Sequence, residues 1–281
     1  MVSRVVGILN VTPDSFSDGG KFDVFDAAIF QLKKMLEDGA EVIDVGAEST
    51  RPQAMPIKDE MEWQRLEKIL PAIILEVKNF NKKTGKKIQT SIDSYHFETI
   101  KKAHEIGVDI INDVSGLIDE KIVKFIAEKN ITTILMHNLS VPTNPDLIIN
   151  PHLNVIEEIL NWARGKISYL EKKGVKKSQL IFDVGIGFGK NSKQAIRILK
   201  NIDAFRILGL PLYVGHSKKS FLDEVNCSDP VMRRGDKQVV NRAEKTLIIS
   251  KYLAEKNIEF LRVHDVKENL AAIKYCVNQG W

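Results

Sequence analysis

The sequence predicts an α/β protein folded as a (β/α)8 TIM barrel, and three observations support this fold class. Eight short runs rich in β-branched residues alternate with longer stretches of helical periodicity. The runs are apolar at nearly every position, as in parallel strands that are buried on both faces. The chain has 281 residues, a usual size for one such barrel, and no composition shift or low-complexity linker divides it. We therefore expect a single domain over residues 1–281.

The eight predicted strands share this apolar character. They are Arg4–Leu9, Glu41–Val45, Ile88–Ile92, Asp109–Asp113, Thr132–Met136, Leu180–Asp183, Pro211–Val214 and Ile258–Val263. Eight alternating units favour a closed barrel over an open, doubly wound sheet. In such a barrel the chemistry lies at the carboxyl ends of the strands, so candidate functional residues are sought there.

Helical periodicity is clearest in four segments between the strands. They are Phe25–Glu37, residues 63–77, residues 155–170 and Val239–Glu255, and Pro71 is expected to kink the second. Apolar side chains at this spacing pack against the core, so they are assigned no function.

The composition is that of an ordinary globular protein, with 43% hydrophobic and 28% charged residues. The net charge of +4 does not call for nucleic acid or a membrane as a partner. Cys227 and Cys276 lie far apart and form no CxxC pair, which fits a reducing compartment. The amino-terminal apolar run is too short for a signal peptide, and no run approaches the ~18 apolar residues of a membrane span. We therefore expect a soluble, cytoplasmic protein.

The segment after the first strand, Asn10–Gly20, is rich in Asn, Asp, Ser and Gly and carries one aromatic residue, Phe16. A solvated turn would explain this composition, but the segment is long for a connection at this face and has the length of a lid. Asn10, at the strand end, can offer a carbonyl oxygen to Mg²⁺, which prefers oxygen ligands.

The second strand runs into Asp44–Pro52, where Asp44 and Glu48 are expected to bracket the mouth of the barrel. Thr50 and Arg51 offer a hydroxyl and a guanidinium to an anion. The structural alternative is an Asp–Arg pair that ties the loop down.

Polar residues recur at the ends of further strands. Asp93, Asn112 and Asp183 supply hydrogen-bond acceptors and one mixed donor–acceptor group from three strands. Such a set suits a flat heterocycle with several N–H groups and a carbonyl, because each buried polar group of a ligand needs a partner.

Three glycines follow the sixth strand, in the segment Asp183–Lys190. Their spacing is not that of a phosphate-binding P-loop. Gly185, Gly187 and Gly189 instead predict tight turns that leave Phe188 exposed as a stacking surface.

The last two strands end in basic residues. Gly215–Ser220 brings lysines and serines to an expected helix start, a favourable place for an anion, and Lys219 can also reach a ring carbonyl or nitrogen. Strand alternation puts Arg262 and His264 on one face, which suits a diphosphate. A histidine at a strand end is often only structural, but its neighbour Arg262 favours the binding role.

Taken together, these segments closely resemble those of the dihydropteroate synthases, folate-pathway enzymes that sulfonamides inhibit. The resemblance spans nearly the whole chain and rests on six motifs in the family's order. They are NVTPDSFSDGG, DVGAESTRP, INDVSG, DVGIGFGK, GHSKKSF and RVHDV.

The resemblance implies that a dihydropterin carrying a methyl diphosphate reacts with 4-aminobenzoate to give 7,8-dihydropteroate and diphosphate. The matching pterin-binding residues are Asp93, Asn112, Met136, Asp183 and Lys219. The matching diphosphate residues are Asn10, Thr50, Arg262 and His264, with Mg²⁺ on Asn10. The matching 4-aminobenzoate residues are Phe16, Thr50, Pro52, Phe188, Lys219 and Ser220, and the loops Val11–Gly20 and Ala47–Ile57 resemble those that order over the site. The catalytic set implied is Asp93, Asp183, Lys219, Arg262 and His264, and family members usually pair as homodimers.

The chain departs from the family pattern in three places. Val184 stands where proline is usual, and Lys218 replaces the usual arginine, which keeps the charge but loses the planar fork. The segment after His137 lacks the usual glutamine–glycine run. None of these changes removes a residue to which chemistry is assigned.

Elementary chemistry agrees with the implied reaction. An aryl amine is nucleophilic without a base, so the departing diphosphate is what needs stabilisation, by Mg²⁺, Arg262, His264 and the helix start near Ser220. If the C–O bond breaks first, Asp93 and Asp183 can stabilise a pterin cation. Two alternatives remain: a barrel that passes a methyl group from a folate to a corrinoid, and a non-catalytic pterin-binding barrel.

Overall fold

Eight parallel strands form a closed barrel in the computed structural model, which describes residues 3–12, 24–50, 54–225, 231 and 241–277. The strands are β1 (Arg4–Asn10), β2 (Val42–Gly46), β3 (Gln89–Asp93), β4 (Ile110–Asp113), β5 (Thr132–Met136), β6 (Leu180–Asp183), β7 (Leu212–Gly215) and β8 (Phe260–Val263). Each pairs with the next in sequence order, and β8 closes the ring against β1. The predicted fold class and all eight predicted strands are confirmed, with shifts of one or two residues at their ends.

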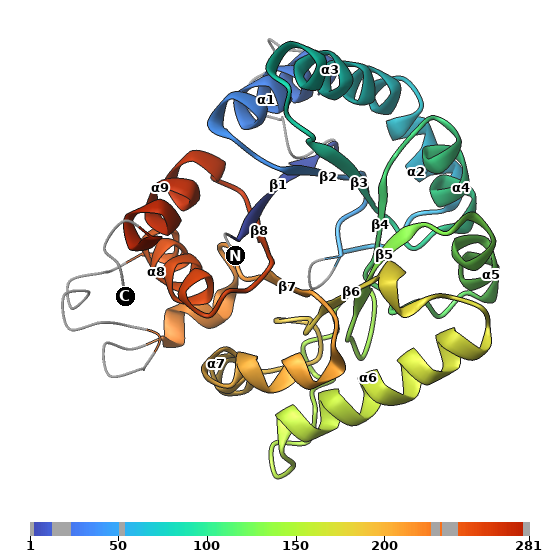
Figure 1. The fold of residues 1–281 in the computed structure, drawn as a ribbon. Helices are drawn as coiled ribbons and strands as arrows, with labels where there is room; N and C mark the ends of the chain where they lie inside the picture. Colours follow the sequence, from blue (N-terminus) through green and yellow to red (C-terminus); the bar gives the residue numbers. More distant parts are fainter. Residues whose placement is uncertain (1–2, 13–23, 51–53, 226–230, 232–240, 278–281) are drawn as a thin grey trace.

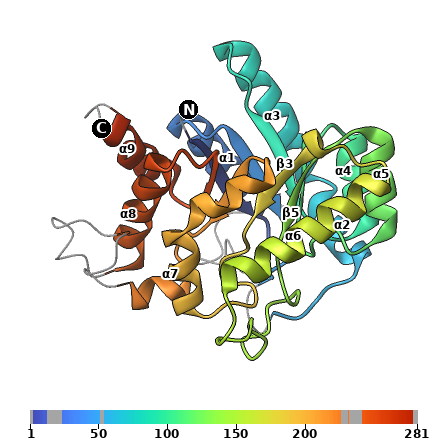
Figure 2. The same cartoon turned by 60° about the horizontal axis from the view of Figure 1, so that its bottom comes forward.

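The helices surround the strands on the outside of the ring (Figures 1 and 2). They are α1 (Val24–Asp38), α2 (Asp59–Leu66), α3 (Ile69–Thr84), α4 (Phe97–Glu105), α5 (Glu120–Lys129), α6 (Val155–Lys172), α7 (Ser192–Lys200), α8 (Arg242–Glu255) and α9 (Val266–Val277). Short 3-10 helices are η2 (Lys177–Gln179), η3 (Ile202–Leu208) and η4 (Ser220–Glu224). No helix in the described ranges is long and apolar enough to cross a membrane.

Local sequence explains where several helices begin and end. The side chains of Asp119 and Asn154 accept hydrogen bonds from the first backbone N–H groups of α5 and α6, which otherwise lack partners. Gly85 ends α3 with a φ of 72°, a conformation that side chains disfavour. The prediction that Pro71 kinks one continuous helix is wrong. The periodic segment is two helices, α2 and α3, and Pro71 lies in the first turn of α3, where its missing N–H costs little.

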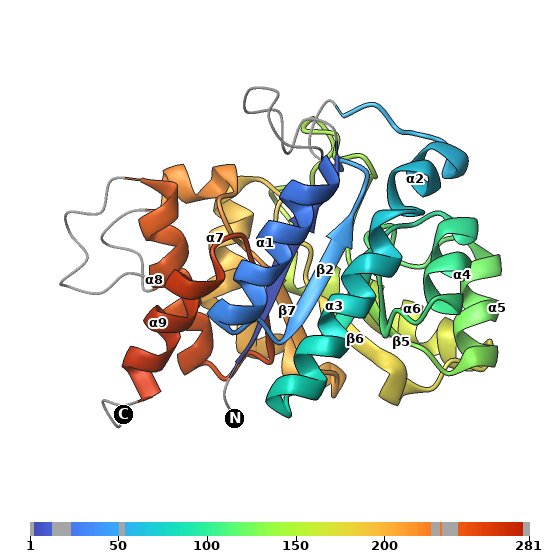
Figure 3. The ribbon, with the colours of Figure 1, turned by 90° about the horizontal axis from the view of Figure 1, so that it is seen from above.

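Apolar residues fill the amino-terminal end of the barrel interior. This interior cluster consists of Val6, Val42, Ile110, Ile134, Ile181, Tyr213 and Phe260. Side chains two positions apart on a strand point to the same side, so the next interior layer is two residues further along each strand. That layer contains Asp44, Asn112, Met136, Asp183 and Arg262. Figure 3 shows the strands running from the end that holds the amino terminus toward the end near the start of α2. The polar layer therefore lies toward the carboxyl ends of the strands, as predicted.

Candidate active site

An ionic network occupies the barrel interior at this level. Arg262 donates from Nε to Asp44 Oδ2 at 2.6 Å and from Nη2 to Asp93 Oδ2 at 2.7 Å. Asn112 Nδ2 donates to the same oxygen of Asp44 at 3.0 Å. Four residues from β2, β3, β4 and β8 are thus held together, and three of them are predicted site residues.

Asp44 is the residue that the sequence placed incorrectly. It was expected at the mouth with Glu48, but its side chain is fully buried inside the barrel. Its position two residues after Val42, an interior residue, is the signal that would have found it. The oxygen Oδ1 accepts no hydrogen bond within the described part of the chain, so Asp44 retains an unused acceptor.

The ionic network affects proton affinities. Burial raises the pKa of Asp93 to about 7, while the guanidinium of Arg262 acts in the opposite direction by stabilising the carboxylate. Burial disfavours the charge on Arg262, but Asp44 and Asp93 outweigh this effect and raise its pKa. Arg262 is therefore a permanent cation, and Asp93 is the member of the pair that can change its charge near neutral pH.

Asp183 and Lys219 form a second charged group, from β6 and the segment after β7. Burial raises the pKa of Asp183, and the nearby Lys219 lowers it. Burial lowers the pKa of Lys219 to about 8, with Asp183 acting against this shift. Lys219 Nζ donates to the carbonyl of Ile186 and lies 5.0 Å from the centre of the Phe188 ring. The predicted ring-binding lysine and stacking aromatic are thus in contact with each other.

The glycine loop after β6 is held against the loop after β5. The buried amine of Lys190 contacts His137 Nδ1 at 2.7 Å and the carbonyls of His137 and Phe188 at 3.1 and 2.8 Å. Gly185 has a φ of +66°, and a Cβ there would lie 1.8 Å from the His137 carbonyl oxygen. The predicted tight turn is confirmed at Gly185, and Lys190 is a buried amine to which the motifs assigned no role. Both contacts keep Phe188 in place beside Lys219.

Asn10 ends β1 and is paired in register with Gly46, which is paired in turn with Asp93. A Cβ at Gly46 would lie 3.4 Å from Asp93 Cβ and 3.7 Å from Asn10 Oδ1. The absent side chain of Gly46 thus lies between an amide oxygen and a carboxylate, which are groups that Mg²⁺ accepts as ligands. The described residues contain no group of three or more His, Cys, Asp or Glu that could hold a metal. With the described side chains alone, a metal at Asn10 would take substrate oxygens or water among its other ligands.

His264 lies just beyond β8 and is tied to the segment after β7. Its Nδ1 is 3.0 Å from Ser217 Oγ, and its backbone N–H donates to the same oxygen at 3.3 Å. Lys218 forms an ion pair with Asp265 at 2.8 Å. The expected helix start at Ser220 is only the five-residue 3-10 helix η4, which is too short to favour an anion by its dipole. His264 and Arg262 therefore face different partners, Ser217 and the two buried carboxylates.

The remaining predicted residues are placed as follows. Met136 is buried at the end of β5, in register with Asp183. The carbonyl of Thr50 accepts hydrogen bonds from Thr143 N and Oγ1, both at 3.2 Å, which joins the loops after β2 and β5. Ser220 is exposed at the start of η4. Phe16 and Pro52, predicted for 4-aminobenzoate, lie outside the described residues, as does Arg51.

Comparison with known proteins identifies the family to which the chain belongs. Residues 6–264 match the model of the family described as pterin binding enzyme. The chain is 37% identical over 271 residues to dihydropteroate synthase from Clostridium beijerinckii, covering 96% of this chain and 91% of that one. It is 35% identical to a probable bifunctional folylpolyglutamate synthase/dihydropteroate synthase from Halobacterium salinarum, covering 97% of this chain but only 31% of that larger protein.

Solved structures are similar over nearly the whole chain. Dihydropteroate synthase from Anaplasma phagocytophilum with bound 6-hydroxymethylpterin-monophosphate superposes with a TM-score of 0.83 at 35% identity, covering 99% and 100% of the two chains. The Xanthomonas albilineans enzyme with 4-aminobenzoic acid gives a TM-score of 0.83 at 28% identity, covering 100% and 94%.

Proposed function

Since the chain belongs to the pterin-binding enzymes, and within them to the dihydropteroate synthases, we propose how its residues form 7,8-dihydropteroate. The substrates are (7,8-dihydropterin-6-yl)methyl diphosphate and 4-aminobenzoate, and the second product is diphosphate. The observation that carries the assignment to this site is the buried cluster of Asp44, Asp93, Asn112 and Arg262 at the carboxyl ends of the strands.

The pterin binds to the polar layer inside the barrel. Asp93 and Asp183 accept hydrogen bonds from its N–H groups, and Lys219 donates to a ring carbonyl or nitrogen. Asn112 gives its amide N–H to Asp44, which leaves its carbonyl oxygen for the ligand. Met136 packs against the ring. Each residue is buried or half-buried, so every polar edge of the pterin needs one of these partners.

The diphosphate binds above the pterin, near Asn10, Thr50, Arg262 and His264. Among described residues, Arg262 Nη1 donates no hydrogen bond while Nε and Nη2 hold Asp44 and Asp93, so Nη1 is the guanidinium nitrogen that meets a phosphate oxygen. The side-chain oxygen of Asn10 would hold Mg²⁺, and the bound ion would supply positive charge that stabilises the departing diphosphate. His264, oriented by Ser217, donates to the same group.

The amine of 4-aminobenzoate attacks without a general base, because its lone pair is free at neutral pH. Phe188 and Lys219, which contact each other, form one wall of its site, with Ser220 beside them. Phe16, Thr50 and Pro52 complete the site. The C–O bond breaks before the C–N bond forms, and Asp93 and Asp183 stabilise the resulting pterin cation. The loops that follow β1 and β2 exclude water from it.

Product formation tests the assignment. The purified chain, incubated with the pterin diphosphate, 4-aminobenzoate and Mg²⁺, is expected to release dihydropteroate and diphosphate in equal amounts. Methyl transfer from a methylfolate to a corrinoid, without dihydropteroate, would support the methyltransferase alternative. Pterin binding without turnover would support the non-catalytic one.

Two further properties are proposed on the same family basis. The protein forms a homodimer, which sedimentation equilibrium tests. It acts in the cytoplasm, in keeping with its two widely separated cysteines.

A further inference from the structure

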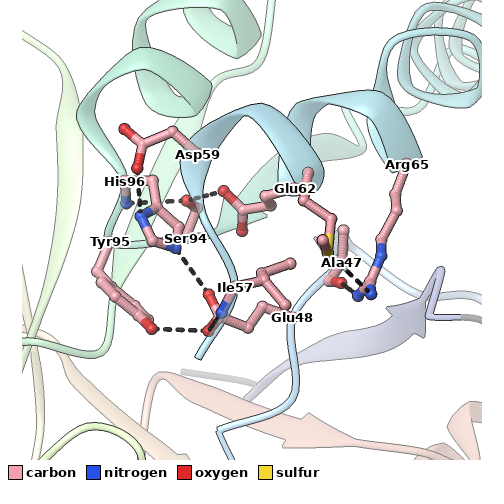
Figure 4. Close-up of polar contacts among 10 residues, drawn as sticks. Ala47, Glu48, Ile57, Asp59, Glu62, Arg65, Ser94, Tyr95 and His96 are labelled. Carbon is pink, nitrogen blue, oxygen red and sulfur yellow. Dashed lines mark hydrogen bonds and ion pairs between the residues drawn. The ribbon is translucent and has the colours of Figure 1, made fainter. Parts of the chain in front are cut away.

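The side chain of Glu48 joins the two ends of the loop that leads from β2 to α2 (Figure 4). Its Oε1 accepts hydrogen bonds from the backbone N–H of Ile57 at 3.0 Å and from the hydroxyl of Tyr95 at 2.8 Å. Glu48 and Ile57 are the residues at which the loop leaves the barrel and returns. We call this pair of positions the loop neck.

His96 holds the loop neck from the segment after β3. Its Nε2 is 2.8 Å from Glu48 Oε2, and its Nδ1 is 2.9 Å from Asp59 Oδ1, at the start of α2. A carboxylate only accepts hydrogen bonds, and a neutral imidazole has a single N–H. Only the protonated ring can therefore satisfy both contacts. His96 is also the N-cap residue of α4, yet its side chain makes no capping bond to that helix.

The groups around His96 are mostly acidic. Glu48 and Asp59 contact the ring, and Glu62 of α2 is buried nearby with Oε2 2.7 Å from Ser94 Oγ. The Tyr95 ring lies 4.4 Å from the imidazole, centre to centre. Burial disfavours the charge on His96, but the bond to Glu48 and the charges of Glu62, Glu48 and Asp59 outweigh it and raise its pKa above the ordinary 6.5.

The two glutamates near His96, Glu62 and Glu48, differ in how their surroundings shift their pKa values. Burial raises the pKa of Glu62 to about 7. Burial also opposes the charge on Glu48, but hydrogen bonds from His96, Tyr95 and Ile57 lower its pKa. Glu48 thus stays ionised near neutral pH, and Glu62 is the carboxyl group beside Ser94 that titrates there.

The loop neck is linked to the substrate site at both sides. Glu48 lies two residues after Gly46, which separates Asn10 from Asp93. Thr50, two residues further on, is held by Thr143 through its carbonyl. Thr50 is thus anchored by Thr143 on one side and by the chain from Glu48 on the other. Loss of the neck contacts is therefore expected to loosen a residue that the proposed function assigns to both diphosphate and 4-aminobenzoate.

We propose that protonated His96 is a positioning residue that holds the loop neck through Glu48 and Asp59 and thereby supports binding of 4-aminobenzoate. This inference rests on the proposed function. A His96 pKa above its unfolded value means that the contact is complete at low pH and is lost as pH rises through the folded value. Affinity for 4-aminobenzoate therefore weakens on the alkaline side.

The kinetic test compares His96→Gln, which cannot be charged, with His96→Arg, which always is. KM for 4-aminobenzoate and kcat are measured from pH ~6 to pH ~9, around the range where histidine titrates. In the wild type KM rises severalfold over this range, while kcat at saturation changes little. At pH ~6 His96→Gln has the high KM and His96→Arg has the low one, and neither variant shows the part of the rise that follows the titration of residue 96. A His96→Gln enzyme with the wild-type KM and pH profile overturns the proposal.

Two further variants sharpen the kinetic result. Asp59→Asn removes one of the charges that stabilise the imidazolium, so the rise in KM moves to lower pH; an unmoved rise overturns the proposal even if His96→Gln fails to fold. His152→Gln is the matched control, because His152 is exposed in the segment before α6. It leaves the wild-type profile unchanged.

A measurement without turnover separates this inference from the proposed function. Amide hydrogen exchange of residues 54–58, corrected for intrinsic rates, reports on the hydrogen bond that the Ile57 N–H donates to Glu48. We expect faster exchange in His96→Gln than in the wild type at pH ~6, and similar exchange at pH ~9. If His96→Gln and the wild type exchange at equal rates at both pH values, the inference is overturned. If exchange differs as expected but no dihydropteroate is formed, only the proposed function is contradicted.

Discussion

Arg262 on β8 and Asp44 on β2 form an ion pair inside the barrel, with 2.6 Å between Nε and Oδ2 although 218 positions separate them in sequence. The same oxygen of Asp44 accepts the amide N–H of Asn112 at 3.0 Å. One buried carboxylate therefore orients both a proposed diphosphate residue and a proposed pterin residue.

Replacement of Asp44 by Asn tests this role. The change leaves a buried guanidinium with one anionic partner in place of two, and breaking a buried pair costs about 3–5 kcal/mol. We expect the free energy of unfolding, measured in urea, to fall by about this amount, and pterin affinity to fall with it. The exposed pair Asp223–Arg242 supplies the control, because Asp223→Asn should leave both values close to wild type. Wild-type stability and pterin affinity in Asp44→Asn would contradict the role.

Arg262 and His264 should differ in what they bind. Arg262→Ala is expected to lower kcat/KM for the pterin diphosphate by about 30-fold or more, since truncating a buried, hydrogen-bonded charge costs about 2–5 kcal/mol. It also frees Asp93, so affinity for the pterin without diphosphate should fall too. His264→Ala should weaken only diphosphate binding. Calorimetric titration with 6-hydroxymethylpterin and with diphosphate separates the two, and unchanged binding and turnover of Arg262→Ala would refute its assignment.

Gly185 should be among the least replaceable residues of the site. An added Cβ would lie 1.8 Å from the His137 carbonyl oxygen, which forces the β5 and β6 loops apart. Gly85→Ala is the matched control, because Gly85 also has a positive φ but no atom within 4 Å of the added Cβ. We expect Gly85→Ala to cost about 1–2 kcal/mol from backbone strain alone. Gly185→Ala should cost clearly more and abolish activity. Equal losses in thermal unfolding would show that the contact with His137 is unimportant.

Lys219 should give the reaction an alkaline limit. Because burial lowers its pKa from 10.5 to about 8, kcat/KM for the pterin diphosphate, measured with saturating 4-aminobenzoate, should fall as pH rises through about 8. The folded pKa lies below the unfolded one, so the native protein binds fewer protons between these values, and the contribution of Lys219 to stability rises over the same range. Activity should therefore fall without loss of stability from this group. Lys219→Arg should lack the fall near pH 8; its persistence in that variant would assign the fall to another group.

The order of bond breaking can be tested directly. The label is ¹⁸O in the oxygen that joins the methylene carbon to phosphorus in the pterin diphosphate. If the C–O bond breaks first, this label should exchange with the non-bridging oxygens of the same phosphorus when 4-aminobenzoate is absent. Nuclear magnetic resonance of the phosphorus atoms detects this exchange. Strict dependence of C–O cleavage on the amine would instead favour a concerted displacement.

The His96 contact illustrates a kind of site residue that single-sequence reasoning did not find. Ser94, Tyr95 and His96 follow a predicted strand, and their composition is that of an ordinary turn. The proposed role of His96 depends on its contacts with Glu48, in the loop after another strand, and Asp59, at the start of another helix. Neither periodicity nor motif spacing contains that pairing.

The sequence by itself determined the barrel, the polar strand ends and the family motifs, because these depend on local alternation and on residues that are neighbours in the chain. Tertiary structure alone decided that Asp44 lies inside the barrel, that Arg262 meets Asp44 and Asp93, and that His96 holds Glu48. The physical reason is the closure of the sheet. Alternation states which face of a strand a side chain occupies, but only the register of eight strands around a closed ring determines which side chains meet across it.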